Sequence, residues 1–600
     1  MNNGHKDYSE KLGDFTTSPR VITISVLAIG IGIISTFIAW ILLRLIGFFT
    51  NLFYYGRVSG ALVSPAANHL GWFAVLIPIA GGLVIGLMAR YGSERIRGHG
   101  IPEALESILI NSSKVQPRLA ILKPISAAIS IGSGGPFGAE GPIIMTGGAI
   151  GSVISQLFHL TAAERKTLLV AGAAAGMAAT FATPIAAVLL AVELLLFEWK
   201  PRSAIPVALA SATAGAARRY ILGLGPLFPV PHHTMFIGPS GLFGCVVAGL
   251  LAGGLSALLT LGVYAAEDSF MKLPIHWMWW PAIGGLAVGL GGLIFPQALG
   301  VGYDTIQSLL QGDVPRAVIA GVLLVKSMIW VISLGSGTSG GVLAPLLMMG
   351  AALGGIEATF LPHEGAGFWP LVSMGAILGG TMRAPFTAIL FALELTHDIS
   401  VLLPLLVAAM LAHATTVLLL KRSILTEKVA RRGFHLTREY STDPLEILFV
   451  REVMRTNVVA LPAEGTIADM RRILVRQPVQ RGQHLFPVID KERRVKGVIT
   501  RRRLRELLDR GDPERSLGDV LQEPVVARPD EPLRMVVFRM AETGLTRMPV
   551  VEWGTGRLAG MVSLEDLLMA RVRKLDEERR RERVLRLRLP FGSPASVARE

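Results

Sequence analysis

Long apolar stretches dominate the first 420 residues, and several are long enough to cross a bilayer, which takes about 20 apolar residues in a helix. Stretches of spanning length occur at Val21–Phe49, Gly71–Leu87, Leu169–Phe197, Phe243–Tyr264, Met278–Ile294, Ala317–Leu334 and Leu402–Leu420. Shorter apolar runs broken by glycine and proline lie at Ile143–Phe158, Leu343–Leu353 and Phe386–Leu395. Because lipid-exposed backbone must bond to itself, the pattern predicts an all-α polytopic membrane region.

After Pro444 the pattern changes to short strands and amphipathic helices. FPVID, VKGVIT and a basic helix RRRLRELL are followed by RMPVVE, LAGMVS and LEDLLMA in the same order. This duplication predicts a soluble α/β module of two repeats. The expected organisation is an N-terminal segment 1–20, a membrane region 21–433, a linker 434–449, soluble repeats 450–510 and 516–573, and a basic tail 574–600.

Composition and charge agree with this division. Mean hydropathy is +0.52, and only 17% of residues are charged. Segment 421–600 nevertheless holds 37 of the 58 Lys and Arg residues and 26 of the 44 Asp and Glu residues. By the positive-inside rule we expect both termini on the cytoplasmic side of the cell (inner) membrane. Cys245 is the only cysteine, so no intrachain disulfide can form.

Two phrases in the membrane region are related by a constant spacing of 203 residues. Gly132–Pro142 reads GSGGPFGAEGP, and Gly335–Pro345 reads GSGTSGGVLAP. Further downstream, Thr180–Leu194 matches Thr381–Leu395 at a spacing of 201. Duplicated broken segments in a membrane chain are typical of a transport site between two halves. The predicted repeats span about 71–222 and 243–420.

Three glycine-bearing segments, each with a proline, open helical stretches. A helix N-terminus carries unpaired N–H groups and about half a positive charge. Several such ends meeting at mid-membrane would bind a small anion through partial charges that still release it. The alternative is that the glycines only permit close helix packing. The candidate residues are Gly98, His99, Gly100, Ile101, Pro102, Gly138, Ala139, Gly141, Pro142, Gly341, Val342 and Leu343.

On these motifs the chain, from about Val21 to Gly433, resembles the CLC family of chloride channels and proton-coupled anion exchangers. Lys123 stands where that family often has a buried lysine. The resemblance implies two inverted helical repeats in a homodimer, with one pore per subunit for chloride or a similar small anion. The matching motifs are GHGIP (98–102), GAEGP (138–142), GVLAP (341–345) and GGTMRAPFTAILFALELT (379–396).

Glu140 is an ionisable side chain at membrane depth beside a helix start, which marks it as functional. The resemblance implies that it is the gating glutamate, whose carboxylate competes with the anion or is neutralised by a proton. The family's site serine is replaced by His99, its site tyrosine by Leu425 and its motif aromatic by Leu343. A histidine can donate to an anion and changes its charge near neutral pH, so His99 is either a pH sensor or a neutral donor.

The internal glutamate of the family's proton-coupled members is replaced by Leu194. This favours channel-like or weakly proton-coupled conduction gated by Glu140. The alternative is a proton-coupled antiporter with a substitute internal site, for which Glu198, four residues beyond Leu194 on a helical face, is the candidate. Chloride, nitrate, bromide and fluoride remain open as the anion.

The soluble module resembles a pair of CBS domains, which often bind adenosine-containing nucleotides. Ser563 and Asp566 match the family's ribose-binding pair, whereas the first repeat has Thr500 with Arg503 in place of the aspartate. Either the pair binds an adenine nucleotide or cyclic dinucleotide weakly or at a single site, or it is a structural dimerisation module.

Other classes are less well supported. A CBS-containing divalent cation transporter needs a cage of oxygen ligands, and Glu140, Glu193 and Glu394 do not form an evident one. No catalytic constellation is present, so no enzyme activity, required cofactor or nucleic-acid partner is expected.

Overall fold

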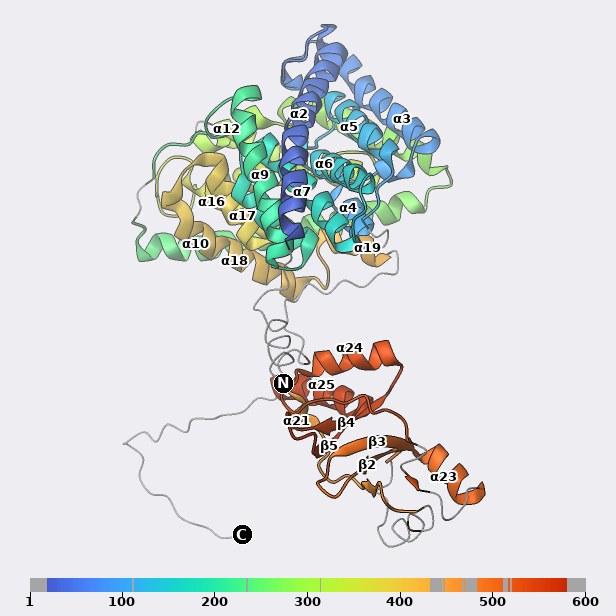
Figure 1. Cartoon of the computed structure of the whole chain (residues 1–600). Coiled ribbons are helices and arrows are strands. Elements are labelled where there is room, and N and C mark those ends of the chain that lie inside the picture. The colour runs from blue at the N-terminus through green and yellow to red at the C-terminus, as the bar shows by residue number, and fades with distance from the viewer. Residues whose placement is uncertain are drawn as a thin grey trace, which may run out of the picture. The chain divides into compact units, whose positions relative to one another are not determined.

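The computed structural model describes residues 19–109, 113–233, 236–312, 314–431, 445, 448–466, 469, 483–510, 516–517 and 521–579. The chain divides into two compact units, Met1–Arg438 and Glu439–Glu600, each described by itself below (Figure 1). The predicted N-terminal segment, linker and basic tail fall largely outside the described residues.

The membrane unit consists of helices of very unequal length. In its described part, six segments have the length and apolar composition of a membrane span: Arg20–Tyr55, Gly71–Tyr91, Pro239–Met271, Trp277–Ile294, Arg316–Gly335 and Ile399–Arg431. The helices are α2 (Arg20–Tyr55), α3 (Leu76–Tyr91), α4 (Ile101–Leu109), α5 (Pro117–Gly132), α6 (Glu140–Gln156), α7 (Ala162–Phe181), α8 (Pro184–Leu190), η4 (Ala191–Leu196), α9 (Pro201–Ile221), α10 (Pro239–Met271), α11 (Trp280–Ile294), α12 (Tyr303–Gln311), α13 (Arg316–Gly321), η7 (Val322–Lys326), α14 (Ser327–Gly335), α15 (Leu343–Glu357), α16 (Phe368–Met382), α17 (Pro385–Thr396), α18 (Leu402–Leu419) and α19 (Ile424–Arg431).

One predicted span is wrong. Leu169–Phe197 is not a single helix, because α7 ends at Phe181 and α8 begins at Pro184. Ala182 adopts a left-handed conformation, with φ of 60°. Proline lacks an amide hydrogen and disfavours helical geometry in the residue before it, so the chain breaks here although its hydropathy is continuous. The related break between α16 and α17 has Arg383 at φ of 55°.

The order and packing of helices repeat within the unit. Helix α2 packs on α9, α7 and α5 (Figure 1), and α10 packs on α18, α16 and α14. Helices α6 and α15 begin 203 residues apart, as do the Gly-rich phrases that precede them. Helix α2 thus packs in the first half much as α10 packs in the second.

The two repeats complete each other's helices through a pair of carboxylates. Glu193 accepts a hydrogen bond from the Thr387 N–H (2.9 Å) in the first turn of α17, and another from the Thr387 hydroxyl (2.6 Å). Glu394 accepts hydrogen bonds from the N–H groups of Ile185 (3.0 Å) and Ala186 (2.8 Å), in the first turn of α8. Each carboxylate thus caps a helix N-terminus in the other repeat.

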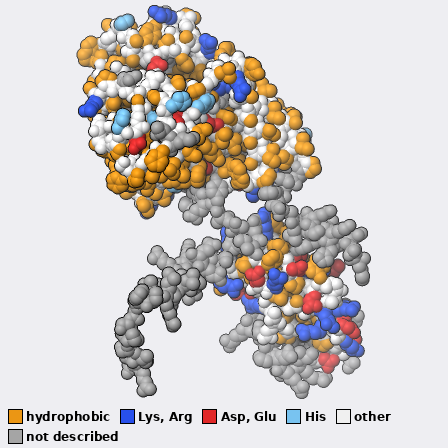
Figure 2. Space-filling model, turned by 90° about the vertical axis from the view of Figure 1, so that its left-hand side faces the viewer, with side chains coloured by type: hydrophobic (Ala, Val, Ile, Leu, Met, Phe, Trp, Pro, Cys, Tyr) orange, Lys and Arg blue, Asp and Glu red, His pale blue; other side chains and the backbone are white. Residues whose placement is uncertain are grey.

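The surfaces of the two units differ in character. On the face seen in Figure 2, hydrophobic side chains make up most of the coloured surface of the membrane unit, and the soluble unit shows many charged ones. Large apolar residues such as Phe243 and Leu258 are more than half exposed on α10. Such a surface fits a lipid environment and would be unusual for a water-exposed protein.

The soluble unit contains the predicted strands and helices. Strand β1 (Leu461–Pro462) pairs in parallel with β2 (Leu485–Ile489), and β2 pairs antiparallel with β3 (Val495–Thr500). Strands β4 (Arg547–Val551) and β5 (Leu558–Ser563) form the second antiparallel pair. The helices are α21 (Val450–Val453), α23 (Arg501–Arg510), α24 (Leu533–Thr543) and α25 (Leu564–Arg579).

The start of the first soluble repeat packs into the core of the second repeat. Val450, the first residue of the first predicted repeat, is buried in a core with Leu533 and Val562 of the second repeat. The segments are also joined by an antiparallel bridge between Val498 and Gln522. The repeats consequently share one folding unit.

Candidate functional site

The three glycine-bearing segments lie together inside the membrane unit. The Gly98 N–H donates to the Thr338 carbonyl (2.8 Å), and the Gly340 N–H donates to the Gly98 carbonyl (3.4 Å). Gly138 and Gly341 exchange two backbone hydrogen bonds, at 3.1 and 2.9 Å. The starts of α4, α6 and α15 are therefore brought to one place, where their free N–H groups create a positive potential.

Glycine is required here because two backbones touch. A Cβ atom at Gly141 would overlap the His99 carbonyl oxygen, and one at Gly100 would overlap the Gly141 carbonyl. Gly100 also has φ of +93°, which side chains rarely adopt. These contacts place the segment before α4 directly against the first turn of α6. Glycine at these positions therefore allows the two backbones to touch and also shapes the anion site.

Glu140, the first residue of α6, is fully buried at this junction. A Cβ atom on Gly341 would lie 2.8 Å from its Oε2 atom, so the carboxylate sits between the starts of α6 and α15. Neither carboxylate oxygen has a hydrogen-bond partner among the described residues, although the N–H groups of Glu140 itself and of Ala344, in the first turn of α15, lie close enough to influence it. The side chain thus occupies the position that a small anion would take.

Lys123 is buried on α5 and holds the segment before α4. Its Nζ atom donates to the carbonyls of Ile96 and Gly98, both at 2.7 Å. Nearby, the Ser126 hydroxyl donates to the Ser339 hydroxyl (3.1 Å), which ties α5 to the segment before α15. The lysine therefore adds a positive charge and fixes the backbone of the site.

A cavity of about 490 Å³ reaches His99 from one side, and its walls include Tyr264 and Lys428. His99 is buried, and its Nδ1 atom has no hydrogen-bond partner among the described residues. Glu103 accepts a hydrogen bond from the Gly100 N–H (2.8 Å) and forms an ion pair with Lys428 (2.5 Å). Among the described residues, the His99 ring therefore has a nitrogen that is not engaged in a hydrogen bond, and it lies between the cavity and the helix starts.

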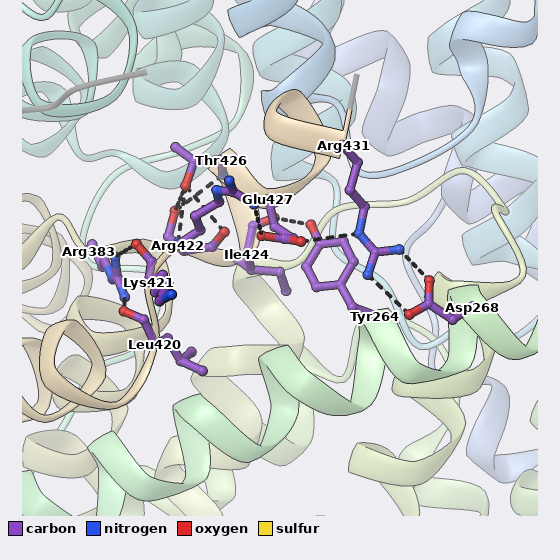
Figure 3. A network of polar contacts seen from close by, with 11 residues as sticks. Tyr264, Asp268, Arg383, Leu420, Lys421, Arg422, Ile424, Thr426, Glu427 and Arg431 are labelled. Atoms are coloured by element: carbon purple, nitrogen blue, oxygen red, sulfur yellow. Dashed lines mark hydrogen bonds and ion pairs between the residues drawn. The ribbon is translucent and has the colours of Figure 1, made fainter. Parts of the chain in front are cut away.

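Leu425 is buried on α19. This short helix is held by polar contacts with residues of α10 (Figure 3). The Tyr264 hydroxyl, from α10, donates to the Ile424 carbonyl (2.5 Å). Arg431 forms two hydrogen bonds to Asp268, at 2.5 and 3.2 Å, and its guanidinium lies 4.7 Å from the centre of the Tyr264 ring. A tyrosine hydroxyl therefore does reach the residue next to Leu425, but from a distant helix that no motif in the sequence indicated.

Arg383 fixes the helix that leads into α19 (Figure 3). Its guanidinium donates to the carbonyls of Thr416 (2.8 Å) and Leu420 (2.5 Å), at the end of α18. The Thr416 carbonyl also accepts from the Leu420 N–H (3.0 Å), and the guanidinium adds a second donor at this helix end, so the side chain acts as a C-terminal cap. The turn between α18 and α19 is held in place by this cap.

The structure changes the interpretation of Leu194 and Glu198. Leu194 is buried in η4, which ends at Leu196, and Phe197 follows with φ of 54°. Glu198 therefore does not lie one helical turn beyond Leu194 on a shared face, and that prediction is corrected. Its carboxylate instead forms ion pairs with Lys200 (3.4 Å) and Arg202 (3.6 Å).

The predicted nucleotide residues of the second soluble repeat have internal partners. Asp566 accepts hydrogen bonds from the N–H (2.9 Å) and hydroxyl (2.6 Å) of Ser563 at the start of α25. Arg455 donates to Asp566 (2.8 Å) and also pairs with Glu565 (3.5 Å). The hydrogen bond to Asp566 raises the pKa of Arg455, so this guanidinium remains charged.

Thr500 and Arg503, the predicted nucleotide residues of the first repeat, also have partners within the soluble unit. The Thr500 hydroxyl accepts a hydrogen bond from the Arg503 N–H (3.3 Å) and caps α23. The Arg503 side chain pairs with Glu506 (3.3 Å). Within the described residues, no group of three or more His, Cys, Asp and Glu side chains is arranged to hold a metal ion.

Comparison with known proteins agrees with this architecture. A family model described as voltage gated chloride channel matches residues 81–417, and a CBS domain model matches 450–510 and 517–573. A voltage-gated ClC-type chloride channel, ClcB of Escherichia coli, is 29% identical over 389 residues, covering 62% of this chain and 91% of that protein.

Two solved structures share the fold. A slow cyanobacterial Cl⁻/H⁺ antiporter superposes with a TM-score of 0.61 at 23% identity, covering 70% of this chain and 99% of that one. A eukaryotic CLC transporter gives a TM-score of 0.56 at 20% identity, covering 91% and 98%. The fold and the junction of helix starts define a multi-pass membrane transport protein with a soluble C-terminal module. The chain belongs to the CLC family of voltage gated chloride channels and carries C-terminal CBS domains.

Proposed function

We propose that the protein conducts chloride or a similar small anion across the bilayer, with Glu140 as the gate and without strict proton coupling. The observation that carries this proposal is the position of the Glu140 carboxylate between the starts of α6 and α15. The carboxylate and the transported anion compete for one positive site. The carboxylate therefore acts as a gate, because the anion passes only when the carboxylate leaves or is protonated.

Leu194 supports the absence of strict coupling. It is fully buried in η4 and cannot exchange a proton. Glu198 lies beyond the end of that helix and is engaged in ion pairs with Lys200 and Arg202. A proton relay through this part of the chain is therefore poorly provided for.

A liposome assay tests the proposal. The purified full chain is reconstituted, a chloride gradient is imposed, and chloride and proton movements are recorded together. Chloride efflux with little accompanying proton movement is expected, and Glu140→Gln should make the efflux insensitive to pH. Failure to move chloride, nitrate, bromide or fluoride would reject anion transport by this chain.

Proton-coupled antiport is the second candidate, favoured by the buried Glu103 close to His99 and Lys428, where a proton could enter from the cavity. In the same assay an antiporter moves protons against their gradient in a fixed ratio to chloride. Glu103→Gln and Glu198→Gln then identify which carboxylate serves as the internal site. Comparing His99→Ser with the parent shows whether the histidine sets the pH dependence or only donates a hydrogen bond.

The assembly and placement of the chain form part of the same proposal. We place both termini in the cytoplasm because segment 421–600 is basic. From the family resemblance we further propose that two copies form a homodimer in the inner membrane, with one pathway each. The CBS pair acts mainly as a structural module, because Asp566 and Arg503 already have partners within the unit. An adenine nucleotide or cyclic dinucleotide would have to displace Arg455 from Asp566.

A further inference from the structure

Arg97 lies beside the anion site but belongs to none of the glycine motifs. It directly precedes Gly98, whose N–H donates to the Thr338 carbonyl (2.8 Å) where the helix starts meet. Its side chain forms part of the wall of the cavity of about 490 Å³ that reaches His99. Only 17% of that side chain is exposed. The guanidinium is therefore held within the cavity wall, next to the segment that forms the site.

Two tryptophans hold this guanidinium. Its central carbon lies 4.7 Å from the centre of the Trp277 ring and 5.6 Å from the centre of the Trp280 ring. Trp277 begins η5 (Trp277–Trp279), Trp280 begins α11, and both residues line the same cavity. The face of an indole ring attracts a guanidinium without removing its charge. The two rings thus fix the position of the cation and leave it positive.

The Gly-rich phrase of the second repeat also makes room for Arg97. The Arg97 Nε atom donates to the Gly337 carbonyl (3.4 Å). A Cβ atom at Gly337 would lie 2.5 Å from the Arg97 Nη2 atom, and Gly337 has φ of +77°. Only glycine therefore fits here. The arginine is held between the segment that precedes α4, the segment that precedes α15 and the start of α11.

The other charged side chains of the cavity do not cancel the charge of Arg97. Lys428 forms an ion pair with the buried Glu103 (2.5 Å). Glu94 lies 3.4 Å from Arg97, but its side chain is 69% exposed, so water and salt screen this pair. The remaining two carry one charge of each sign. The charged residues that line the cavity are Glu94, Arg95, Arg97, Glu103, Glu267 and Lys428.

We propose that Arg97 is an anion-binding residue of the transport pathway: its charge, held on Trp277 and Trp280, binds the anion in the cavity before the anion reaches His99. This inference rests on the proposed anion transport by this chain. A fixed cation in a cleft raises the local concentration of anions and the rate at which they enter. The His99 Nδ1 atom has no hydrogen-bond partner among the described residues, so the anion meets a further polar group in the same cavity.

Tracer chloride exchange tests the role of this charge. The purified full chain is reconstituted in liposomes with equal chloride on both sides, and uptake of radioactive chloride is measured at increasing chloride concentrations. Such exchange proceeds through a channel and through a proton-coupled antiporter alike. Arg97→Gln should raise the half-saturating chloride concentration about fivefold with little change in the maximal rate. Arg97→Lys keeps the charge and should stay within about twofold of the parent.

Ionic strength gives a second measure of the same charge. At about 0.5 M of a salt that the protein does not transport, the difference between the parent and Arg97→Gln should fall below about twofold, because salt screens charges in contact with water. A purely structural defect in Arg97→Gln would persist at every ionic strength.

Chemical modification separates the charge from the contacts of the arginine. Arg97→Cys introduces a thiol at the cavity, whereas the native Cys245 is fully buried. A methanethiosulfonate reagent that attaches an aminoethyl group in detergent, before reconstitution, supplies a positive charge without the contacts to Trp277 and Gly337. It should return the half-saturating concentration to within about twofold of the parent. The matching sulfonatoethyl reagent supplies a negative charge and should raise that concentration beyond the value of Arg97→Gln.

Matched controls complete the test. Arg44 also lies over a tryptophan, 5.7 Å from the centre of the Trp40 ring, but on α2 and outside the cavity wall. Arg44→Gln, and the parent treated with either reagent, should keep the parental half-saturating concentration. Absence of chloride exchange by the parent would reject anion transport itself. If the parent exchanges chloride but Arg97→Gln keeps its half-saturating concentration, or both reagents affect Arg97→Cys alike, the role of Arg97 is overturned.

Discussion

The crossed helix caps make a quantitative prediction about stability. Removing Glu193 leaves the N–H and hydroxyl of Thr387 without their acceptor, and removing Glu394 leaves the N–H groups of Ile185 and Ala186 in the same state. An orphaned buried donor costs about 1–3 kcal/mol. Three of these donors are partly buried and the Ile185 N–H is exposed, so Glu193→Ala and Glu394→Ala should each destabilise the membrane unit by about 2 kcal/mol.

Thermal unfolding of the full chain in detergent tests this prediction. Cys245 is the only cysteine and is fully buried, so a thiol-reactive fluorescent dye reports exposure of one defined site. Each variant should lower the apparent melting temperature by several degrees, roughly 5 °C. Glu164→Ala, which removes the partly exposed carboxylate that accepts from the Thr161 N–H in the capping box of α7 and pairs with Arg20, should cost about 1 kcal/mol and serves as the control.

The symmetry of the two caps gives the result that would refute the reasoning. If one variant melts at the parental temperature while the other is strongly destabilised, the carboxylates do not have equivalent roles in the two repeats. If both melt like the parent, desolvation of the two carboxylates cancels whatever stability their hydrogen bonds contribute.

Other predictions follow from the site and from the soluble unit. Gly141→Ala should reduce chloride efflux at least about tenfold because its methyl group has no room, whereas Gly254→Ala, at an exposed position with no atom near a Cβ, should retain parental efflux. Tyr264→Phe removes one hydrogen bond to α19, so hydrogen exchange of α19 amides should accelerate about fivefold, as mass spectrometry would show. Arg455→Ala should strengthen ATP binding to the full chain in calorimetry by uncovering Asp566, and absence of heat from both proteins would favour a purely structural module.

The sequence indicated the elements of the site better than their connections. Repeated glycine and proline spacings predicted that segments around Gly98, Gly138 and Gly341 belong to one place, and the structure joins them by backbone hydrogen bonds. Hydropathy alone could not show the break before Pro184, because the residues on both sides are equally apolar. It also suggested a helix through Glu198 that the left-handed Phe197 ends.

Long-range partners were beyond the reach of the sequence. A second buried lysine, Lys326, lies at the spacing of the repeat from Lys123, which is a signal that a search for paired buried cations would have found. The Tyr264 bond to α19 and the Arg455 bond to Asp566 join segments more than 100 residues apart. Such contacts depend on how helices and strands pack, and no local pattern of residues encodes them.

The crossed caps also bear on how the chain is made. Helix α8 is synthesised early, but the carboxylate that completes its N-terminus lies 209 residues downstream of Ile185. Until residue 394 has been synthesised, two N–H groups in the first turn of α8 therefore lack the acceptor that they have in the finished protein. A chain truncated before that residue would leave the cap of its first repeat incomplete, so the first half depends on the second for its final hydrogen bonds.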